Sequence, residues 1–254
     1  MFFGKAEGAQ HLSRQRSAKK QQQFTRFNSN VIDFQEYVPE KKKQVRIIPR
    51  NKSQETYFLK LQDQEKKILF AIGPAGTGKT LLATQTAIQL LKSKDIDKII
   101  VTRPAVSVDE QHGFLPGTLE KKMEPWTRPI FDVFAEYYYA KEIQNMLLEG
   151  VIEVSPLAYM RGRTFKNAFI LADEMQNATP NQMKMLLTRI GENSRMVVTG
   201  DLKQADRLED NGLIEFIRLL QDRNTLKYVD LVNFGQKDIE RHPAVREILE
   251  IYGD

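Results

Sequence analysis

The sequence predicts an α/β fold in which a mostly parallel β-sheet is flanked by helices. Two observations lead to this prediction. From residue 66 onward, short apolar runs rich in β-branched residues alternate with longer segments whose apolar residues recur at helical spacing. A glycine-rich turn also joins the first apolar run to the first of the following helical segments. Because parallel strands are usually joined by crossover helices, this alternation is typical of a sheet buried on both faces.

The elements follow from these periodicities, which distinguish half-buried helices from short buried strands. The expected strands are residues 68–72, 97–105, 151–156, 167–174, 195–201 and 226–232, and the expected helices are residues 51–63, 81–92, 128–149, 179–191, 212–223 and 242–252. Ser53 is a possible N-cap of the first helix. Thr179 is the expected N-cap of the fourth helix, with Pro180 at its first position and Gly191 as its stop. Gly150 is expected to close the helix over 128–149.

Two segments outside this alternation differ in composition. Residues 1–28 are polar, rich in glutamine and without periodicity, and we expect them to be a disordered basic tail. Residues 29–254 form the single predicted domain, in which 29–65 are a basic, extended arm. Residues 106–127 contain prolines and glycines and are predicted to be a long ordered insertion without regular structure.

The charge distribution separates the tail from the domain. Residues 1–50 carry eleven Lys/Arg and four Asp/Glu, a net charge of +7, and the whole chain carries +5, which leaves −2 for residues 51–254. A basic tail is equally consistent with contact to nucleic-acid phosphates and with a purely solubilising function. The chain has no cysteine and only three scattered histidines, so neither disulfides nor a zinc site are expected. Without a membrane-spanning run or a signal-peptide pattern, we expect a cytoplasmic protein with no membrane partner.

The glycine-rich turn carries the strongest functional signal. Residues 73–80 read GPAGTGKT, between a predicted strand and a predicted helix. This is the pattern G-x-x-x-x-G-K-T, in which glycines let backbone N–H groups surround a phosphate and the helix N-terminus adds a positive dipole. The expected nucleotide-binding residues are Gly73, Pro74, Ala75, Gly76, Thr77, Gly78, Lys79 and Thr80. Lys79 is expected to contact the β- and γ-phosphates, and the Thr80 hydroxyl to ligate Mg²⁺.

Two further motifs end predicted strands. FILADE places Asp173 and Glu174 after a buried run, where Asp173 is expected to hold Mg²⁺ through water and Glu174 to activate the attacking water as a general base. An acidic helix N-terminus is the alternative for this pair, but it does not explain the buried run. VVTGDLKQ places Gln204 after the next strand, with Asp201 and Thr199 nearby, where a polar side chain can sense the γ-phosphate.

These motifs together resemble the PhoH family, phosphate-starvation-associated ATPases related to the core of superfamily-1 helicases and frequent in bacteria and their viruses. The similarity covers roughly residues 50–251, and the blocks PLAYMRGRT and DEMQN are its most specific parts. The family usually has alanine where this chain has Met175, which puts no assignment in doubt. The resemblance implies a P-loop NTPase fold with a single RecA-like domain, the cofactors ATP and Mg²⁺, and a bacterial or phage-infected host cytoplasm.

The resemblance also implies contacts outside the phosphate loop. Gln54 matches the position where helicase relatives recognise adenine through a glutamine amide, although spacing alone favours an exposed helix residue. Thr102, Arg103 and Pro104 match an element beside which single-stranded nucleic acid often passes. Arg103 is equally consistent with a structural ion pair to a carboxylate.

The PLAYMRGRT block precedes the strand that carries Asp173. Tyr159 offers a stacking surface, and Arg161 and Arg163 suit the backbone and bases of RNA or single-stranded DNA. The same arginines also suit contact with a γ-phosphate across a subunit boundary, or hydrogen bonds to backbone carbonyls of the insertion. The tyrosines at 137–139 lie at helical spacing and are interpreted as core and interface packing rather than a base-stacking platform.

The residues after Gln204 are too few for a second RecA-like domain, which in superfamily-1 helicases supplies catalytic arginines. We therefore expect a homo-oligomer, a ring expected to be hexameric, in which a neighbouring subunit completes the site. The candidate arginine fingers are Arg189, Arg195 and Arg241, with Arg161 and Arg163 behind them; a cis contact from Arg241 is the main competitor.

The sequence thus predicts an Mg²⁺-dependent ATPase that acts on RNA or single-stranded DNA. The alternative is a nucleotide-dependent switch or assembly factor that works through a protein partner, without motor activity on nucleic acid. A kinase is disfavoured by Glu174, because kinases of this superfamily usually lack that second carboxylate.

Overall fold

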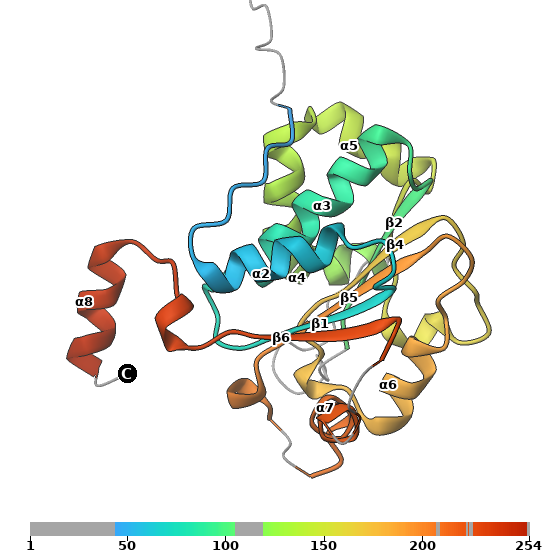
Figure 1. Ribbon diagram of the computed structural model, residues 1–254. Helices are drawn as coiled ribbons and strands as arrows, with labels where there is room; N and C mark the ends of the chain where they lie inside the picture. The colour runs from blue at the N-terminus through green and yellow to red at the C-terminus, as the bar shows by residue number, and fades with distance from the viewer. Residues whose placement is uncertain (1–43, 105–118, 207–208, 222, 224–225, 253–254) are drawn as a thin grey trace, which may run out of the picture. The chain divides into compact units, whose positions relative to one another are not determined.

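The computed structural model describes residues 44–104, 119–206, 209–221, 223 and 226–252 (Figure 1). The chain divides into two units, Met1–Lys41 and Lys42–Asp254, and all described residues belong to the second. The predicted disordered tail, residues 1–28, and the first part of the predicted arm, residues 29–43, lie outside the described residues.

The domain is organised around a six-stranded sheet in the order β3-β2-β4-β5-β1-β6. The strands are β1 Ile68–Ile72, β2 Lys98–Thr102, β3 Ile152–Val154, β4 Ala168–Ala172, β5 Arg195–Gly200 and β6 Val229–Asn233. Every neighbouring pair is parallel, which confirms the predicted parallel sheet. In this order β4, β5 and β1 are adjacent, so the loops after their carboxyl ends meet at one edge.

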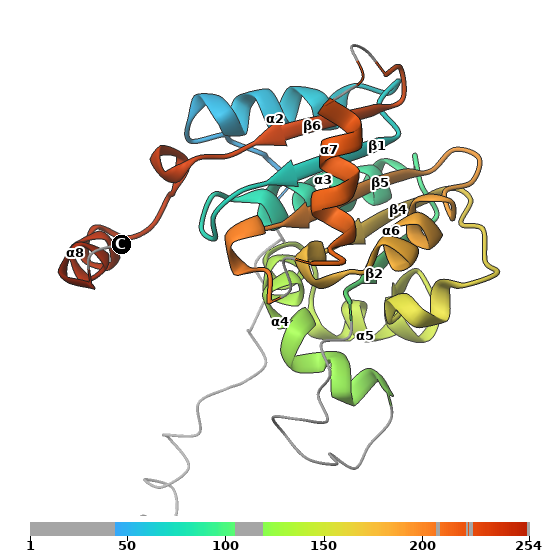
Figure 2. The ribbon, with the colours of Figure 1, turned by 90° about the horizontal axis from the view of Figure 1, so that it is seen from below.

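Helices cover both faces of the sheet (Figures 1 and 2). The helices are α2 Lys52–Gln62, α3 Lys79–Ser93, α4 Leu119–Tyr137, α5 Ala140–Leu148, α6 Pro180–Leu187, α7 Gly212–Gln221 and α8 Pro243–Tyr252, with short 3₁₀ turns η3 Leu157–Met160, η4 Met175–Asn177, η5 Leu202–Gln204 and η6 Gln236–Asp238. One hydrophobic cluster joins the sheet to α2, α3, α4 and α5, and a second joins it to α6 and α7.

Alternation along the strands builds these two clusters. In β1, Leu69 and Ala71 face the first cluster, whereas Phe70 and Ile72 face the second. Because successive side chains of a strand point to opposite faces, a strand covered on both sides must be apolar throughout. This is why the sequence shows continuous apolar runs rather than alternating ones. Among the described residues, no helix is long and apolar enough to cross a membrane.

The segment between residues 106 and 149 differs from the prediction. Residues 105–118 lie outside the described residues, but 119–127, predicted to lack regular structure, form the first turns of α4. Pro125 and Pro129 lie inside this helix, where proline is normally costly. The buried side chains of Ile130, Val133, Phe134 and Tyr137 recur at helical spacing, and their packing outweighs that cost.

The single helix predicted over 128–149 is in fact two. The chain turns at Tyr138–Tyr139, and α5 begins at Ala140. The backbone N–H of Tyr139 donates to the Glu142 carboxylate at 2.6 Å, a bond that satisfies a free donor at the start of a helix. The ring of Tyr137 is buried and its hydroxyl accepts a hydrogen bond from Gln85 at 2.8 Å, in agreement with the packing interpretation of the tyrosines.

Two predicted helix ends also differ. The N-cap of α2 is Asn51, whose side chain accepts from the Gln54 backbone N–H, rather than Ser53. Helix α6 begins as predicted, with Thr179 as N-cap, but ends at Leu187, before Gly191. Gly191 instead lies against the backbone of Phe165, where a β-carbon would be 2.5 Å from the carbonyl oxygen. This glycine is required by close backbone approach, not by a helix stop.

Candidate nucleotide-binding site

The glycine-rich turn lies between β1 and α3, as the sequence predicts. Gly76 has a φ of +82°, and Gly73 has a φ of +146°, backbone conformations that residues with a β-carbon rarely adopt. A β-carbon on Gly73 would also overlap with the carbonyl oxygen of Phe234, beyond β6. The loop therefore needs glycine for its dihedral angles and for its contact with the chain beside it.

Lys79 lies inside this loop. Its side chain is 6% exposed, and its Nζ donates to the carbonyl oxygens of Gly73 and Pro74, each at 2.7 Å. Burial lowers the pKa of Lys79, while the carboxylates of Glu174, Asp201 and Asp173 act in the opposite direction. The ammonium group is thus held in the concave side of the loop, where a bound anion would meet it.

Asp173 connects the ends of three strands. Its Oδ1 accepts a hydrogen bond from Thr80 Oγ1 at 2.6 Å and another from Thr199 Oγ1 at 2.7 Å. Thr80 lies in the first turn of α3 and Thr199 lies near the end of β5, so the carboxylate is fixed from two sides. Mg²⁺ typically keeps several waters and takes only one or two protein oxygens besides phosphate, so a hydroxyl ligand with a carboxylate hydrogen-bonded to it, close enough to hold a coordinated water, is a suitable set for this ion. The Thr80–Asp173 pair therefore fits this ion.

Glu174 is held in an unusual conformation. Its φ is +53°, in the left-handed region, and its backbone N–H donates to Thr199 Oγ1 at 3.2 Å. Its carboxylate accepts a hydrogen bond from Gln176 Nε2 at 2.6 Å. The side chain is therefore directed by the residues around it rather than left free in solvent.

Gln176 is a candidate functional residue that sequence reasoning missed. It is buried, donates to Glu174, and accepts a hydrogen bond from the Asp201 backbone N–H at 3.4 Å through Oε1. It therefore links the turn after β4 with the turn after β5. Its position two residues after the acidic pair, inside the DEMQN block, is the sequence signal that could have indicated it.

The turn after β5 brings Asp201 and Gln204 close to this edge. Asp201 is buried and its side chain accepts from the Lys203 backbone N–H at 3.0 Å. Gln204 ends η5 with an exposed side chain, and its backbone N–H donates to the Asp201 carbonyl at 3.0 Å. Its sensing of a γ-phosphate stays a prediction.

Gln54 is buried, not exposed. Only 4% of it is accessible, and its Nε2 donates to the carbonyl oxygen of Thr77 in the phosphate loop at 3.0 Å. Its Oε1 accepts from the Arg50 backbone N–H at 2.9 Å. The interpretation from spacing alone, an exposed helix residue, is therefore wrong, because α2 packs its glutamine directly against the loop. Recognition of adenine stays a prediction.

The predicted nucleic-acid contacts have different surroundings. Arg103, beyond β2, lies 4.0 Å from the Glu174 carboxylate and donates to the Trp126 carbonyl at 3.4 Å. Its ion-pair interpretation thus has a partner within the site. Tyr159, in η3 after β3, is 64% exposed, and Arg161, which follows η3, is also exposed. They lie beyond the carboxyl end of a strand, as Glu174 does.

Arg163 is engaged within the fold. Its guanidinium forms a two-point ion pair with the Glu153 carboxylate, with NH2 to Oε2 at 2.8 Å, and lies 4.6 Å from the centre of the Phe165 ring. The hydrogen bond from Arg163 lowers the pKa of Glu153, and the same bond raises the pKa of Arg163. The partner is a carboxylate, rather than the backbone carbonyls that the sequence analysis considered.

The variant Glu153→Gln is expected to lower the free energy of unfolding by about 1 kcal/mol at pH 7, because the pair is partly exposed to solvent. A carboxylate with a lowered folded-state pKa stabilises above its unfolded pKa, and the effect is lost as pH falls through the folded value. Urea denaturation should therefore show a difference at pH 7 that closes in acid. Glu136→Gln, on an exposed position of α4, serves as control, and an equal loss there would contradict the assignment.

The three candidate arginine fingers also differ in their surroundings. Arg189 donates to the carbonyl oxygens of Met185 and Arg163, each at 3.0 Å. Arg195 begins β5, at the opposite edge of the sheet, and donates to the carbonyl of Lys66 at 3.3 Å. Arg241 lies at the phosphate loop of its own chain, because a β-carbon on Gly76 would be 2.5 Å from its Nε.

Together, the parallel sheet, the loop after β1 and the Thr80–Asp173 pair define a P-loop NTPase, a class that uses a nucleoside triphosphate and Mg²⁺. The family model for PhoH-like protein matches residues 46–253. The chain therefore belongs to the PhoH family.

Curated relatives agree with this assignment. A PhoH-like protein of Synechocystis is 46% identical over 74% of this chain and 57% of its own length. A PhoH-like protein of Bacillus subtilis is 45% identical over 73% of this chain and 58% of its own length. Protein PhoH of Escherichia coli K12 is 40% identical, over 81% and 58%. The chain thus spans less than two thirds of the length of each of these relatives.

Among solved structures, the DNA-bound helicase MrfA matches 72% of this chain and 25% of its own chain. The sequence identity is 13% and the TM-score is 0.43, so this similarity is too distant to bear on function.

Proposed function

We propose that this protein is an Mg²⁺-dependent ATPase of the superfamily-1 helicase type, acting with RNA or single-stranded DNA. The observation that carries the proposal is the arrangement of Glu174 beside Asp173. The Asp173 carboxylate accepts a hydrogen bond from Thr80, and the Glu174 carboxylate accepts one from Gln176. The two carboxylates are therefore held by different partners and are suited to different tasks. A site that only binds nucleotide has no need of the second, positioned carboxylate.

In this proposal each side chain has one task. Bound Mg²⁺ would neutralise charge on the β- and γ-phosphate oxygens, held by Thr80 directly and by Asp173 through water. Lys79 stabilises the same phosphates as a point charge. Glu174 accepts a proton from the attacking water through its carboxylate oxygen. Gln54 contacts the adenine, and Gln204 responds to loss of the γ-phosphate.

The nucleic-acid contact is proposed from the exposed side chains of Tyr159 and Arg161 and the partly exposed side chain of Arg103. Arg161 and Tyr159 follow β3, and Arg103 follows β2, its neighbour in the sheet. An aromatic surface with a nearby guanidinium suits a single strand, because bases stack and phosphates pair with arginine. Arg103 also lies next to Glu174, so a bound strand there is placed to influence hydrolysis.

Arg161→Ala is expected to weaken binding of an oligo-uridine and to reduce the slope of log K against log salt by about 0.7, the value for one phosphate contact on a single strand. Fluorescence anisotropy across a salt series measures this slope. Lys166→Ala removes an exposed cation before β4, at the opposite edge of the sheet, and should leave the slope unchanged. Equal slopes for Arg161→Ala and the unmodified protein would place the strand elsewhere.

The proposed function itself is tested by the rate of ATP hydrolysis with and without poly-uridine or single-stranded DNA. Hydrolysis that requires Mg²⁺ and rises with either polymer supports the full proposal. Hydrolysis without stimulation at any salt concentration would leave an ATPase and remove the nucleic-acid coupling.

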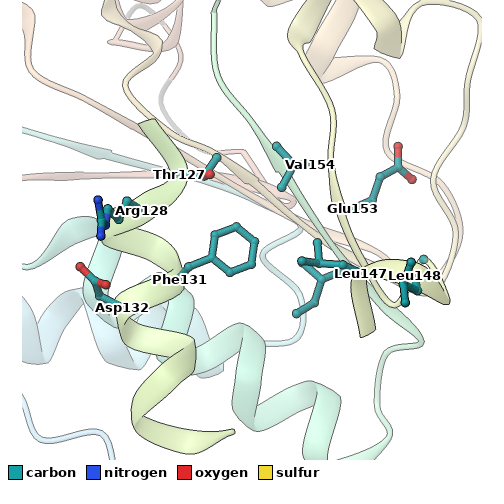
Figure 3. A pocket seen from close by; sticks show the side chains of 10 residues that line it. Thr127, Arg128, Phe131, Asp132, Leu147, Leu148, Glu153 and Val154 are labelled. Atoms are coloured by element: carbon teal, nitrogen blue, oxygen red, sulfur yellow. The ribbon is translucent and has the colours of Figure 1, made fainter. Parts of the chain in front are cut away.

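One observation favours the alternative of a nucleotide-dependent switch or assembly factor with a protein partner. A cavity of about 540 Å³ opens between α4, α5 and β3, lined mainly by apolar side chains that include Phe131, Leu147 and Val154 (Figure 3). Leu148, on its rim, is 80% exposed. Exposed apolar surface of this kind is typical of contacts between proteins.

The predicted ring of subunits stays a prediction. It rests on the need for a cationic side chain from a neighbour, a need that is smaller if Arg241 of the same chain supplies that cation. Sedimentation of the active protein tests it, and full ATPase activity in a monomer would contradict it.

A further inference from the structure

The chain beyond β6 runs along the phosphate loop of the same subunit. The Phe234 backbone N–H donates to the Ile72 carbonyl at 2.7 Å, and the Glu240 backbone N–H donates to the Gly76 carbonyl at 2.9 Å. Between these two bonds the carbonyl of Phe234 lies against Gly73. We call residues 234–241 the loop-flanking segment. It contacts both the start and the middle of the loop.

Arg241 ends this segment directly at the loop. Its Nε occupies the space in front of Gly76, and its Cγ lies 3.1 Å from the position that a β-carbon on Gly76 would take. The residue is exposed and carries a positively charged guanidinium with several N–H donors. A second cation therefore stands beside the phosphate loop, in addition to the buried Lys79.

The loop-flanking segment is held by α2. Asn51 Nδ2 donates to Glu240 Oε1 at 3.0 Å and to the Asp238 carbonyl at 3.3 Å. The other end of the same amide caps α2, since Oδ1 accepts from the Gln54 backbone N–H at 2.9 Å. Asp238 is buried and accepts from the Gly235 backbone N–H at 2.8 Å, which closes the turn of the segment.

We propose that Arg241 completes the catalytic site in cis, by contacting the phosphates of a nucleotide bound to its own subunit, and that Asn51 and Glu240 are the positioning residues that place it there. The inference rests on the proposed function and names the cation which that function still needs. Arg189 and Arg195 are less suited, because both donate to backbone carbonyls away from the loop.

The first test replaces the cation. Arg241→Ala should lower kcat for ATP hydrolysis by about 1,000-fold, the lower end of what such arginines contribute. Arg241→Lys should fall between, because lysine keeps the charge but lacks the planar fork. Lys237→Ala removes another exposed cation from η6 and serves as control. Equal rates for Arg241→Ala and Lys237→Ala would overturn the proposal.

The second test distinguishes cis from trans. Chains carrying Arg241→Ala are mixed with chains carrying Lys79→Ala, and the ATPase rate is compared with the sum of the separate rates. Action in cis predicts no gain over that sum, because neither chain holds both residues. Restored activity would overturn the proposal and establish a trans finger.

The third test concerns positioning. Asn51→Ser keeps a side-chain oxygen for the N-cap but is too short to reach Glu240. It should lower kcat by about 10-fold, since small displacements of a catalytic group are costly. Adding Arg241→Ala to Asn51→Ser should then cost less than Arg241→Ala costs alone, a coupling that independent residues do not show. Additive effects would remove Asn51 from the mechanism.

Failure here is distinguishable from failure of the proposed function. If the unmodified chain hydrolyses ATP and Arg241→Ala does so equally well, only the cis arginine is wrong. If the unmodified chain neither binds nor hydrolyses ATP, the proposed function fails and the inference fails with it.

Discussion

Lys79→Ala is expected to weaken binding of ATP by about 100-fold, the equivalent of about 3 kcal/mol for lost charge-assisted hydrogen bonds. The reason lies in the position of the ammonium group. It is buried within the loop and bonded to two loop carbonyls, and the carboxylates of Glu174, Asp201 and Asp173 favour its charged form. Without it these negative groups face an incoming triphosphate with no cation inside the loop to offset them.

Binding of a fluorescent ATP analogue, with and without Mg²⁺, measures this effect. Lys79→Arg is the informative companion, because it keeps the charge but places a larger planar group in a space that fits an ammonium; it should also bind poorly. Lys166→Ala is the matched control for removal of a cation outside the site. Tight binding by Lys79→Ala would mean that the nucleotide does not enter this loop.

The order of strands explains why the sequence could indicate which motifs lie together. The phosphate loop, the acidic pair and the turn at Asp201 each follow a separate buried strand, and β1, β4 and β5 are neighbours in the sheet. Parallel strands necessarily bring their carboxyl ends to one edge. Recognising three motifs and one fold class was therefore enough to place Thr80 beside Asp173.

What the sequence could not predict depends on tertiary packing. Judged from the local sequence alone, the prolines of α4 predict an interruption of the helix. Only the packing of the buried side chains between Ile130 and Tyr137 explains why the helix continues through them. The amide of Gln54 looks exposed by spacing, because periodicity does not reveal that α2 lies on the phosphate loop. The pairing of Arg163 with Glu153 is equally invisible, since it joins residues on either side of a turn.

The source of the catalytic arginine also depends on tertiary packing, which the sequence does not reveal. The sequence leads to the expectation that a neighbouring subunit supplies the catalytic arginine. The structure shows that the chain after β6 returns to the phosphate loop, with Glu240 bonded to Gly76. If Arg241 acts as we propose, a short segment of the same chain supplies this cation.

Glu174→Gln is expected to lower kcat for ATP hydrolysis by about 1,000-fold while leaving ATP binding unchanged, within the range for loss of a general base. Glutamine has the same shape, so it can occupy the left-handed backbone position as glutamate does and still accept the bond from Gln176. What it cannot do is take a proton from water. The variant therefore separates catalysis from binding, which Lys79→Ala does not.

Single-turnover hydrolysis and analogue binding on the same preparation measure both quantities. Glu136→Gln, on an exposed position of α4, controls for removal of a carboxylate, and Glu174→Asp tests position, because a shorter side chain withdraws the carboxylate from Gln176. Since a displacement of about 1 Å can cost about 100-fold, Glu174→Asp should also be strongly impaired. Hydrolysis by Glu174→Gln at the unmodified rate would assign the base to another group. In that case the turn after β5, where Asp201 is buried near Lys79, is the first place to look.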